Sequence, residues 1–214
     1  MSADAPGLRA HWYRPPNHKW LLALYLPVFT LLLSVTIATY PSKIALLDLT
    51  RDMAAIAHVH PLVGVVSNVG ILLWCATAAI CLFSAGLLRQ HGLRAEARFL
   101  SWGGLLTTVL LLDDLFMIHE YIAPVHFHVN EKVVLAIHAC AAGAYLVSQR
   151  RLILAANYQL LAAAMLLFFL SMVVDVADVP GWWRPAEDGF KLLGIASWFG
   201  YHAGMARHWL SRVR

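Results

Sequence analysis

Two pairs of ionisable residues in one stretch of the sequence have the types and the spacing that chemistry requires. Asp113 and Asp114 are adjacent inside a hydrophobic run, and His119 and Glu120 follow at its end. Seven residues return an α-helix to within roughly 20° of its starting face, so Asp113 and Glu120 are expected to share a face. Charged side chains inside apolar helices are costly and mark functional sites by default.

The next apolar segment repeats this spacing in reverse order. Glu131 and His138 are also seven residues apart, and the connection between the two segments is short. The two helices are therefore expected to run antiparallel, with Glu120 and Glu131 near one end. Asp113 and His138 are then expected about seven residues deeper, which is roughly 10 Å along a helix.

Other segments are expected to place polar groups at a similar level, and together they predict a polar layer inside the bundle. Its further members are Asn68, Asp175, Glu187 and Lys191. In the last apolar segment, Lys191, Trp198 and His202 lie on one stripe at helical spacing. That stripe indicates either ordinary packing or a cavity floor formed by Trp198 and His202.

Carboxylate and imidazole groups are the usual ligands of transition metals, and helical bundles build metal centres from them. We therefore expect a divalent transition metal such as zinc, iron or copper, and we expect Asp114 and Lys191 to act as acid–base groups. The expected metal ligands are Asp113, His119, Glu120, Glu131 and His138. No HExxH or ExxH pair supports this set.

Three functions remain open at this stage. The first is a metal-dependent membrane enzyme acting on a lipid-like or small apolar substrate. The second is a non-catalytic accessory or assembly subunit of a larger membrane complex, in which the charged residues only join helices, for example Lys191 with Asp113 or Glu187. The third is a proton-coupled transporter, although no internal repeat supports it.

The composition indicates a membrane protein. Of 214 residues, 60% are hydrophobic and 13% are charged, whereas soluble domains carry about 25% charged residues. The net charge of +4 is not gathered into a basic face, so nucleic acid is not an expected partner. Membrane lipids, another membrane protein or a second copy of the chain are the expected partners.

The apolar residues form about six segments long enough to cross a bilayer, so the expected fold is an all-α, multi-pass transmembrane bundle. The expected spans are Trp20–Tyr40, Pro61–Leu88, Ala97–Ile118, Val133–Ser148, Leu152–Val174 and Gly189–Ala206. Residues 1–19 form a polar leader, residues 20–209 a single six-helix domain, and residues 210–214 a basic tail. Within this domain, residues 41–60 form either an interfacial helix or a lid over the bundle.

The charges predict the orientation of these spans. Eleven of the sixteen Lys and Arg residues fall in the two termini and the even-numbered loops, which places both termini in the cytoplasm and the protein in the inner (plasma) membrane. Ten of the twelve acidic residues fall on the opposite side. Because acidic residues contribute little to topology, this bias indicates that the outer side uses carboxylates for function.

Overall fold

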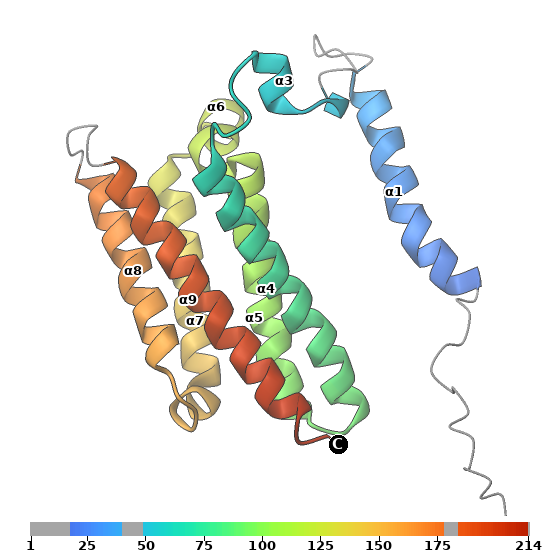
Figure 1. The fold of residues 1–214 in the computed structure, drawn as a ribbon, viewed down its shortest axis with the longest axis vertical. Helices are drawn as coiled ribbons and strands as arrows, with labels where there is room; N and C mark the ends of the chain where they lie inside the picture. The colour runs from blue at the N-terminus through green and yellow to red at the C-terminus, as the bar shows by residue number, and fades with distance from the viewer. Residues whose placement is uncertain (1–17, 40–48, 178–183, 214) are drawn as a thin grey trace, which may run out of the picture. The chain divides into compact units, whose positions relative to one another are not determined.

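The computed structural model describes residues 18–39, 49–177 and 184–213, and these residues form helices and loops without a strand. By their internal contacts, the residues divide into two compact units, residues 1–63 and residues 64–214 (Figure 1). The expected all-helical fold is therefore confirmed for the described residues. The first expected span lies in the first unit, and the other five lie in the second except for Pro61–Val63 at the start of the second span.

Helices α1 and α3 lie in the described part of the first unit. Helix α1, His18–Thr39, carries Pro27 inside it, and its Thr and Ser hydroxyls donate to carbonyls four residues earlier, as Ser34 does to Thr30 at 2.7 Å. Helix α3, Met53–Ala57, has only five residues and none of them is buried. Residues 40–48 lie outside the described residues, and the interfacial helix or lid expected over residues 41–60 stays a prediction.

The second unit contains the site, and its described residues form five long helices and two short ones. These are α4 (Val65–Gln90), α5 (Arg94–Phe116), the π-helix η1 (Ile118–Ile122), α6 (Ala123–Phe127), α7 (Glu131–Leu154), α8 (Gln159–Val176) and α9 (Arg184–Leu210). Helix α9 packs along α4 and α8, and α4 packs along α5 (Figure 1). Helix α7 makes its main contacts with α5, η1 and α6.

Small residues let these helices approach closely, as is common between membrane helices. A Cβ at Gly104 would lie 2.9 Å from Leu82, and a Cβ at Gly103 would lie 2.9 Å from the Nε2 of His202. Helices α4, α5 and α9 therefore meet at glycines that leave no room for a methyl group.

A chain of buried hydrogen bonds joins α5, α7 and α9. The Nε1–H of Trp198 donates to Thr107 at 2.9 Å, and the Nδ1 of His202 lies 2.9 Å from the carbonyl of Trp198. Because Nδ1 donates to that carbonyl, Nε2 accepts from the hydroxyl of Tyr145 at 3.0 Å. Buried polar networks that are fully satisfied stabilise one arrangement of the helices, so we assign His202 to the core and not to the cavity floor.

Three helices within the described residues are long and apolar enough to cross a membrane: Val65–Gln90, Arg94–Phe116 and Glu131–Leu154. Tyr25–Ile37 and Gln159–Asp175 are shorter apolar stretches. The expected boundary between the fourth and fifth spans was wrong, because Leu152–Leu154 belong to α7 and α8 begins at Gln159. The side chain of Asn157 accepts the backbone N–H of Gln159 at 3.2 Å, and hydropathy does not register such a turn.

Candidate functional site

One large cavity lies inside the second unit, between α4, α5, η1, α7, α8 and α9. Its volume is about 670 Å³, within the range of ligand-binding cavities. Nearly all of the ionisable residues expected in the polar layer line it, from four helices and the π-helix. These are Asp113, Asp114, His119, Glu120, Glu131, His138, Asp175, Glu187 and Lys191, with Asp188 as a further member.

Asn68 is the exception among the expected residues. It lies in the second turn of α4, where it is exposed and does not line the cavity. Matching depth along the sequence was not sufficient here, because depth does not determine which face of a helix a residue occupies.

The first ion pair of the cavity joins Asp113 to His119. One carboxylate oxygen of Asp113 contacts the Nδ1 of His119, and the other accepts the backbone N–H of His119 at 3.0 Å. The two side chains are 6% and 12% exposed, so the pair is largely shielded from solvent. The hydrogen bond to Asp113 raises the pKa of the His119 imidazole above its ordinary value, outweighing the opposing effect of burial.

The end of α5 explains why His119, and not Glu120, meets Asp113. Helix α5 ends at Phe116, and Met117 follows with φ of 49°, a left-handed conformation that is unusual for a non-glycine residue. A π-helical turn then begins at Ile118. The regular helix on which Asp113 and Glu120 would share a face is therefore interrupted between them, although both side chains line the cavity.

His119 is held between two carboxylates, and a second histidine lies nearby. The Nε2 of His119 is 3.5 Å from the carboxylate of Glu120, whose side chain is 57% exposed. The Nδ1 of His138 is 3.8 Å from the carboxylate of Asp113. The expected approach of Asp113 and His138 across two antiparallel helices is thus present in the structure.

The second ion pair joins Asp114 to Lys191. The ammonium group lies 2.8 Å from one oxygen of Asp114, and the Nε1–H of Trp74 donates to the other at 2.9 Å. This pair connects α5 to α9 and α4. Among the described residues, Lys191 therefore pairs with Asp114, which differs from the pairings with Asp113 or Glu187 considered from the sequence.

Trp74 was not identified from the sequence as a residue of the site. A signal was present, because a tryptophan in the middle of an apolar span must find a partner for its indole N–H. Trp74 is 3% exposed and stacks on Phe168, with ring centroids 5.7 Å apart. It therefore supports both the Asp114–Lys191 pair and the apolar wall of the cavity.

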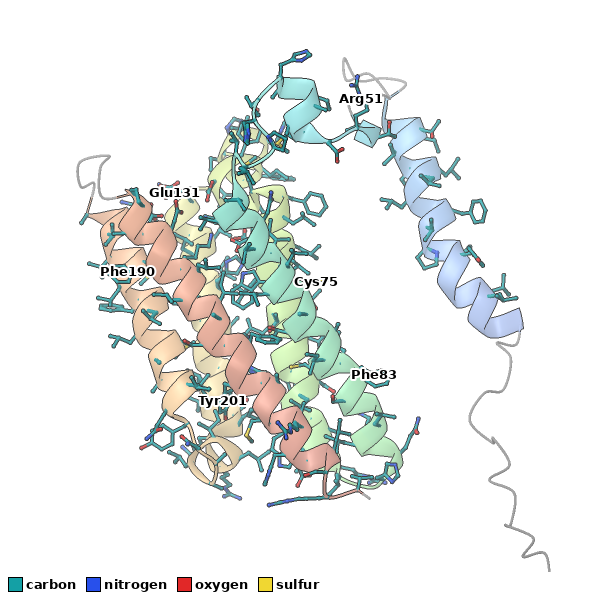
Figure 2. All side chains as sticks on the ribbon, in the orientation of Figure 1. Arg51, Cys75, Phe83, Glu131, Phe190 and Tyr201 are labelled. Carbon is teal, nitrogen blue, oxygen red and sulfur yellow. The ribbon has the colours of Figure 1, made fainter. Side chains whose placement is uncertain are left out.

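Four further carboxylates lie at the exposed end of the cavity, and we call Glu120, Glu131, Asp175 and Asp188 the mouth carboxylates. All four are exposed, and they come from η1, α7, α8 and α9. Glu131 marks this end of the second unit in Figure 2, and Tyr201 lies toward the opposite end of α9. Asp113 and Asp114 lie deeper in the cavity.

The remainder of the cavity is apolar. Leu106, Leu110, Ala142, Phe168 and Trp198 are among the residues that line it below the ion pairs. A second cavity of about 260 Å³ continues between α7 and α8, and it shares Leu146 and Met165 with the first. The site therefore combines a charged end with a long apolar compartment.

The arrangement does not form a metal site of the expected kind. Within the described residues, no group of three or more His, Cys, Asp or Glu side chains is placed to hold a metal ion. Both oxygens of Asp113 already interact with His119. The metal ion therefore stays a prediction from the sequence, and no chemical step is derived from it here.

Comparison with known proteins places the chain in a family without assigning it an activity. No curated protein matches the sequence, and no solved structure matches it. A family model described as "Domain of unknown function (DUF8692)" matches residues 21–205, which include both ion pairs and all the mouth carboxylates. The chain therefore belongs to the DUF8692 family.

Proposed function

We propose that this protein is a multi-pass membrane enzyme that acts on the polar end of a lipid-like substrate by general acid–base chemistry. One observation carries the proposal: a single cavity joins the Asp113–His119 and Asp114–Lys191 pairs to an apolar compartment. Such a cavity suits a molecule with a polar head and an apolar chain. A soluble polar substrate would gain nothing from the apolar walls.

His119 is the proposed general base. Asp113 holds the imidazole through Nδ1 and the backbone N–H, which leaves Nε2 to accept a proton from water or from a substrate hydroxyl. A base that is oriented by a carboxylate is the arrangement that activates nucleophiles in many hydrolytic enzymes. The same nitrogen would then return the proton to the leaving group.

Lys191 is the proposed electrostatic group. Its ammonium is held by Asp114, and it lines the same cavity as His119. A fixed positive charge stabilises negative charge that develops on a substrate oxygen in the transition state. The Asp114–Lys191 pair would thus support the reaction that the Asp113–His119 pair starts.

A membrane position, which the composition and the apolar helices favour, supports this proposal. We propose that the chain crosses the inner membrane six times and that both termini lie in the cytoplasm. The distribution of the basic residues favours that orientation. The mouth carboxylates would then face the outer aqueous phase. The apolar compartment would extend into the bilayer, from which the substrate would enter.

Mass spectrometry of co-purifying lipids tests the enzyme proposal. The full chain and a His119→Gln variant are purified in the same detergent, and their bound lipids are extracted and compared. A base-deficient enzyme should retain unreacted substrate, so we expect a lipid species enriched in the variant and depleted in the wild type. Glu96→Gln, on α5 outside the cavity, is the matched control and should resemble the wild type.

The same preparations separate the competing functions. Identical lipids in all three proteins would contradict the enzyme and indicate a binding protein. A stable co-purifying membrane protein, with Asp113→Asn and Glu120→Gln tolerated, would favour the accessory subunit. Stoichiometric metal that is lost in Asp113→Ala and His138→Ala would restore the metal-dependent reaction.

A further inference from the structure

The charge of the cavity is strongly unbalanced. Seven carboxylates line it, whereas Lys191, His119 and His138 are the lining residues that carry or can carry positive charge within the described part of the chain. Even with both imidazoles protonated and Glu187 left out of the count, the carboxylates are in excess by three. A ligand with a negatively charged head would therefore be repelled from the open end.

The excess is concentrated at the mouth. Asp113 and Asp114 are engaged by His119 and Lys191, and Glu120 faces His119. Glu131, Asp175 and Asp188 form no ion pair with any described residue and come from three different helices. All three side chains are exposed, so a ligand at the mouth can reach their carboxylates.

The apolar walls define the shape of that ligand. Helix α7 lines the first cavity from Glu131 to Leu146, a distance of about 22 Å along its axis. One leaflet of a bilayer core is roughly 15 Å thick, so the cavity can hold one ordinary acyl chain. The second cavity extends the apolar path between α7 and α8 as far as Ile153 and Leu161.

We infer that the ligand of this cavity is a single-chain amphiphile with a positively charged, amine-bearing head group. Its ammonium would lie among Glu131, Asp175 and Asp188, and its chain would lie between α7 and α8. The binding site is the cavity with its apolar walls. The mouth carboxylates favour a ligand whose head group carries a positive charge. This inference rests on the proposed function, because it specifies the substrate class of the same site.

The placement of the head group also fits the ion pairs beneath it. An ammonium at the mouth would position the first atoms of the chain beside His119 and Lys191. Bonds close to the amine would then be the ones exposed to the base. The aromatic wall formed by Trp74, Phe168 and Trp198 would contact the upper chain.

Fluorescence quenching tests the inference with defined probes. Three alkyl chains of equal length, brominated in the upper part of the chain close to the head group, carry an amine, an alcohol or a sulfate head. Binding to the full-length protein in detergent is read from tryptophan quenching. The Trp74→Phe and Trp198→Phe variants, each changing one cavity tryptophan, assign the signal to the cavity.

We expect the amine to bind at least tenfold more tightly than the alcohol, a difference of about 1.4 kcal/mol, and the sulfate more weakly than either. The Glu131→Gln/Asp175→Asn/Asp188→Asn variant should lose the preference for the amine while still binding the alcohol. Glu96→Gln should retain the preference. Raised salt should reduce the preference, because the mouth is exposed.

Each of three other results would overturn a specific part of the inferred binding mode. Equal affinity for all three probes would overturn the amine head group and leave the lipid cavity of the proposed function intact. Absence of cavity quenching by any probe would overturn both. A preference for the amine that survives in the triple variant would show that the mouth carboxylates do not select the ligand.

Discussion

Lys191→Met is expected to destabilise the protein strongly, because it leaves the carboxylate of Asp114 buried without its ion-pair partner. The two groups are 2.8 Å apart, and Asp114 is only 13% exposed. At an effective dielectric constant of about 20, their direct attraction is about 6 kcal/mol, most of which offsets the cost of removing both charges from water.

Removing one partner of a buried pair costs about 3–5 kcal/mol. The side chain of Lys191 is 35% exposed, so the lower end applies and we expect a loss of about 3 kcal/mol. For a chain of this length, that corresponds to a fall of about 6–12 °C in the unfolding temperature. Adding Asp114→Asn to Lys191→Met removes the negative charge that the first substitution leaves buried without a partner. The asparagine side chain still offers an acceptor for the indole N–H of Trp74.

Thermal unfolding of the detergent-solubilised protein measures the effect in a double-mutant cycle. The double variant Asp114→Asn/Lys191→Met should regain more than half of the stability lost in Lys191→Met. Lys132→Met is the matched control, since Lys132 is exposed and does not line the cavity. If Lys191→Met costs no more than Lys132→Met, or if the double variant is no more stable than Lys191→Met, the reasoning about the buried pair is refuted.

Four further predictions concern the surroundings of the two ion pairs. Because its pKa is raised in the folded state, His119 should stabilise the protein fully below its ordinary pKa of 6.5, and thermal stability should fall as pH rises through the raised value; in His119→Gln this fall should be absent. Gly103→Ala should lower the unfolding temperature, because the new methyl would lie 2.9 Å from His202, whereas Gly86→Ala has open space and should not. Trp74→Phe should cost about 1–2 kcal/mol in thermal unfolding, since Asp114 loses a donor while the stacked ring is retained. Gly194→Ala should displace Phe168, 2.7 Å from the new methyl, and thereby weaken binding of the brominated probes.

Much of the site was predictable from residue type and spacing. Ionisable side chains in a mostly apolar sequence are expected to gather in a shared polar environment. A seven-residue spacing on two antiparallel helices was enough to predict that Asp113 lies near His138. The prediction that Lys191 and Asp175 belong to the same layer also agrees with the cavity lining. Burial costs impose this gathering, and those costs can be inferred from composition.

The sequence failed where the backbone departs from a regular helix. The left-handed Met117 and the π-turn after it are not encoded in hydropathy, so a regular helix with Asp113 and Glu120 on one face was expected, and the contact between Asp113 and His119 was not. π-Helical turns occur frequently at functional sites, and here the turn brings His119 back to Asp113. The apolar character of Leu152–Leu154 likewise concealed the turn that separates α7 from α8.

The absence of Asn68 from the cavity has a different cause. Its position along α4 matched the depth of the other polar residues, but its side chain is on an exposed face. Trp74, six residues later, points into the bundle and reaches Asp114. Six residues correspond to about 600° of rotation, so these two residues lie on different faces, and depth without rotation was an incomplete criterion.

Photo-crosslinking with a chain-labelled amphiphile tests the central claim most directly. A long-chain amine with a diazirine at the end of its chain is bound to the purified full-length protein, irradiated, and located by peptide mass spectrometry. Crosslinks are expected on α7 and α8, centred on Leu146 and Met165, where the two cavities meet. Crosslinks spread over the exposed faces of α4 and α5, with none on this α7–α8 path, would contradict it.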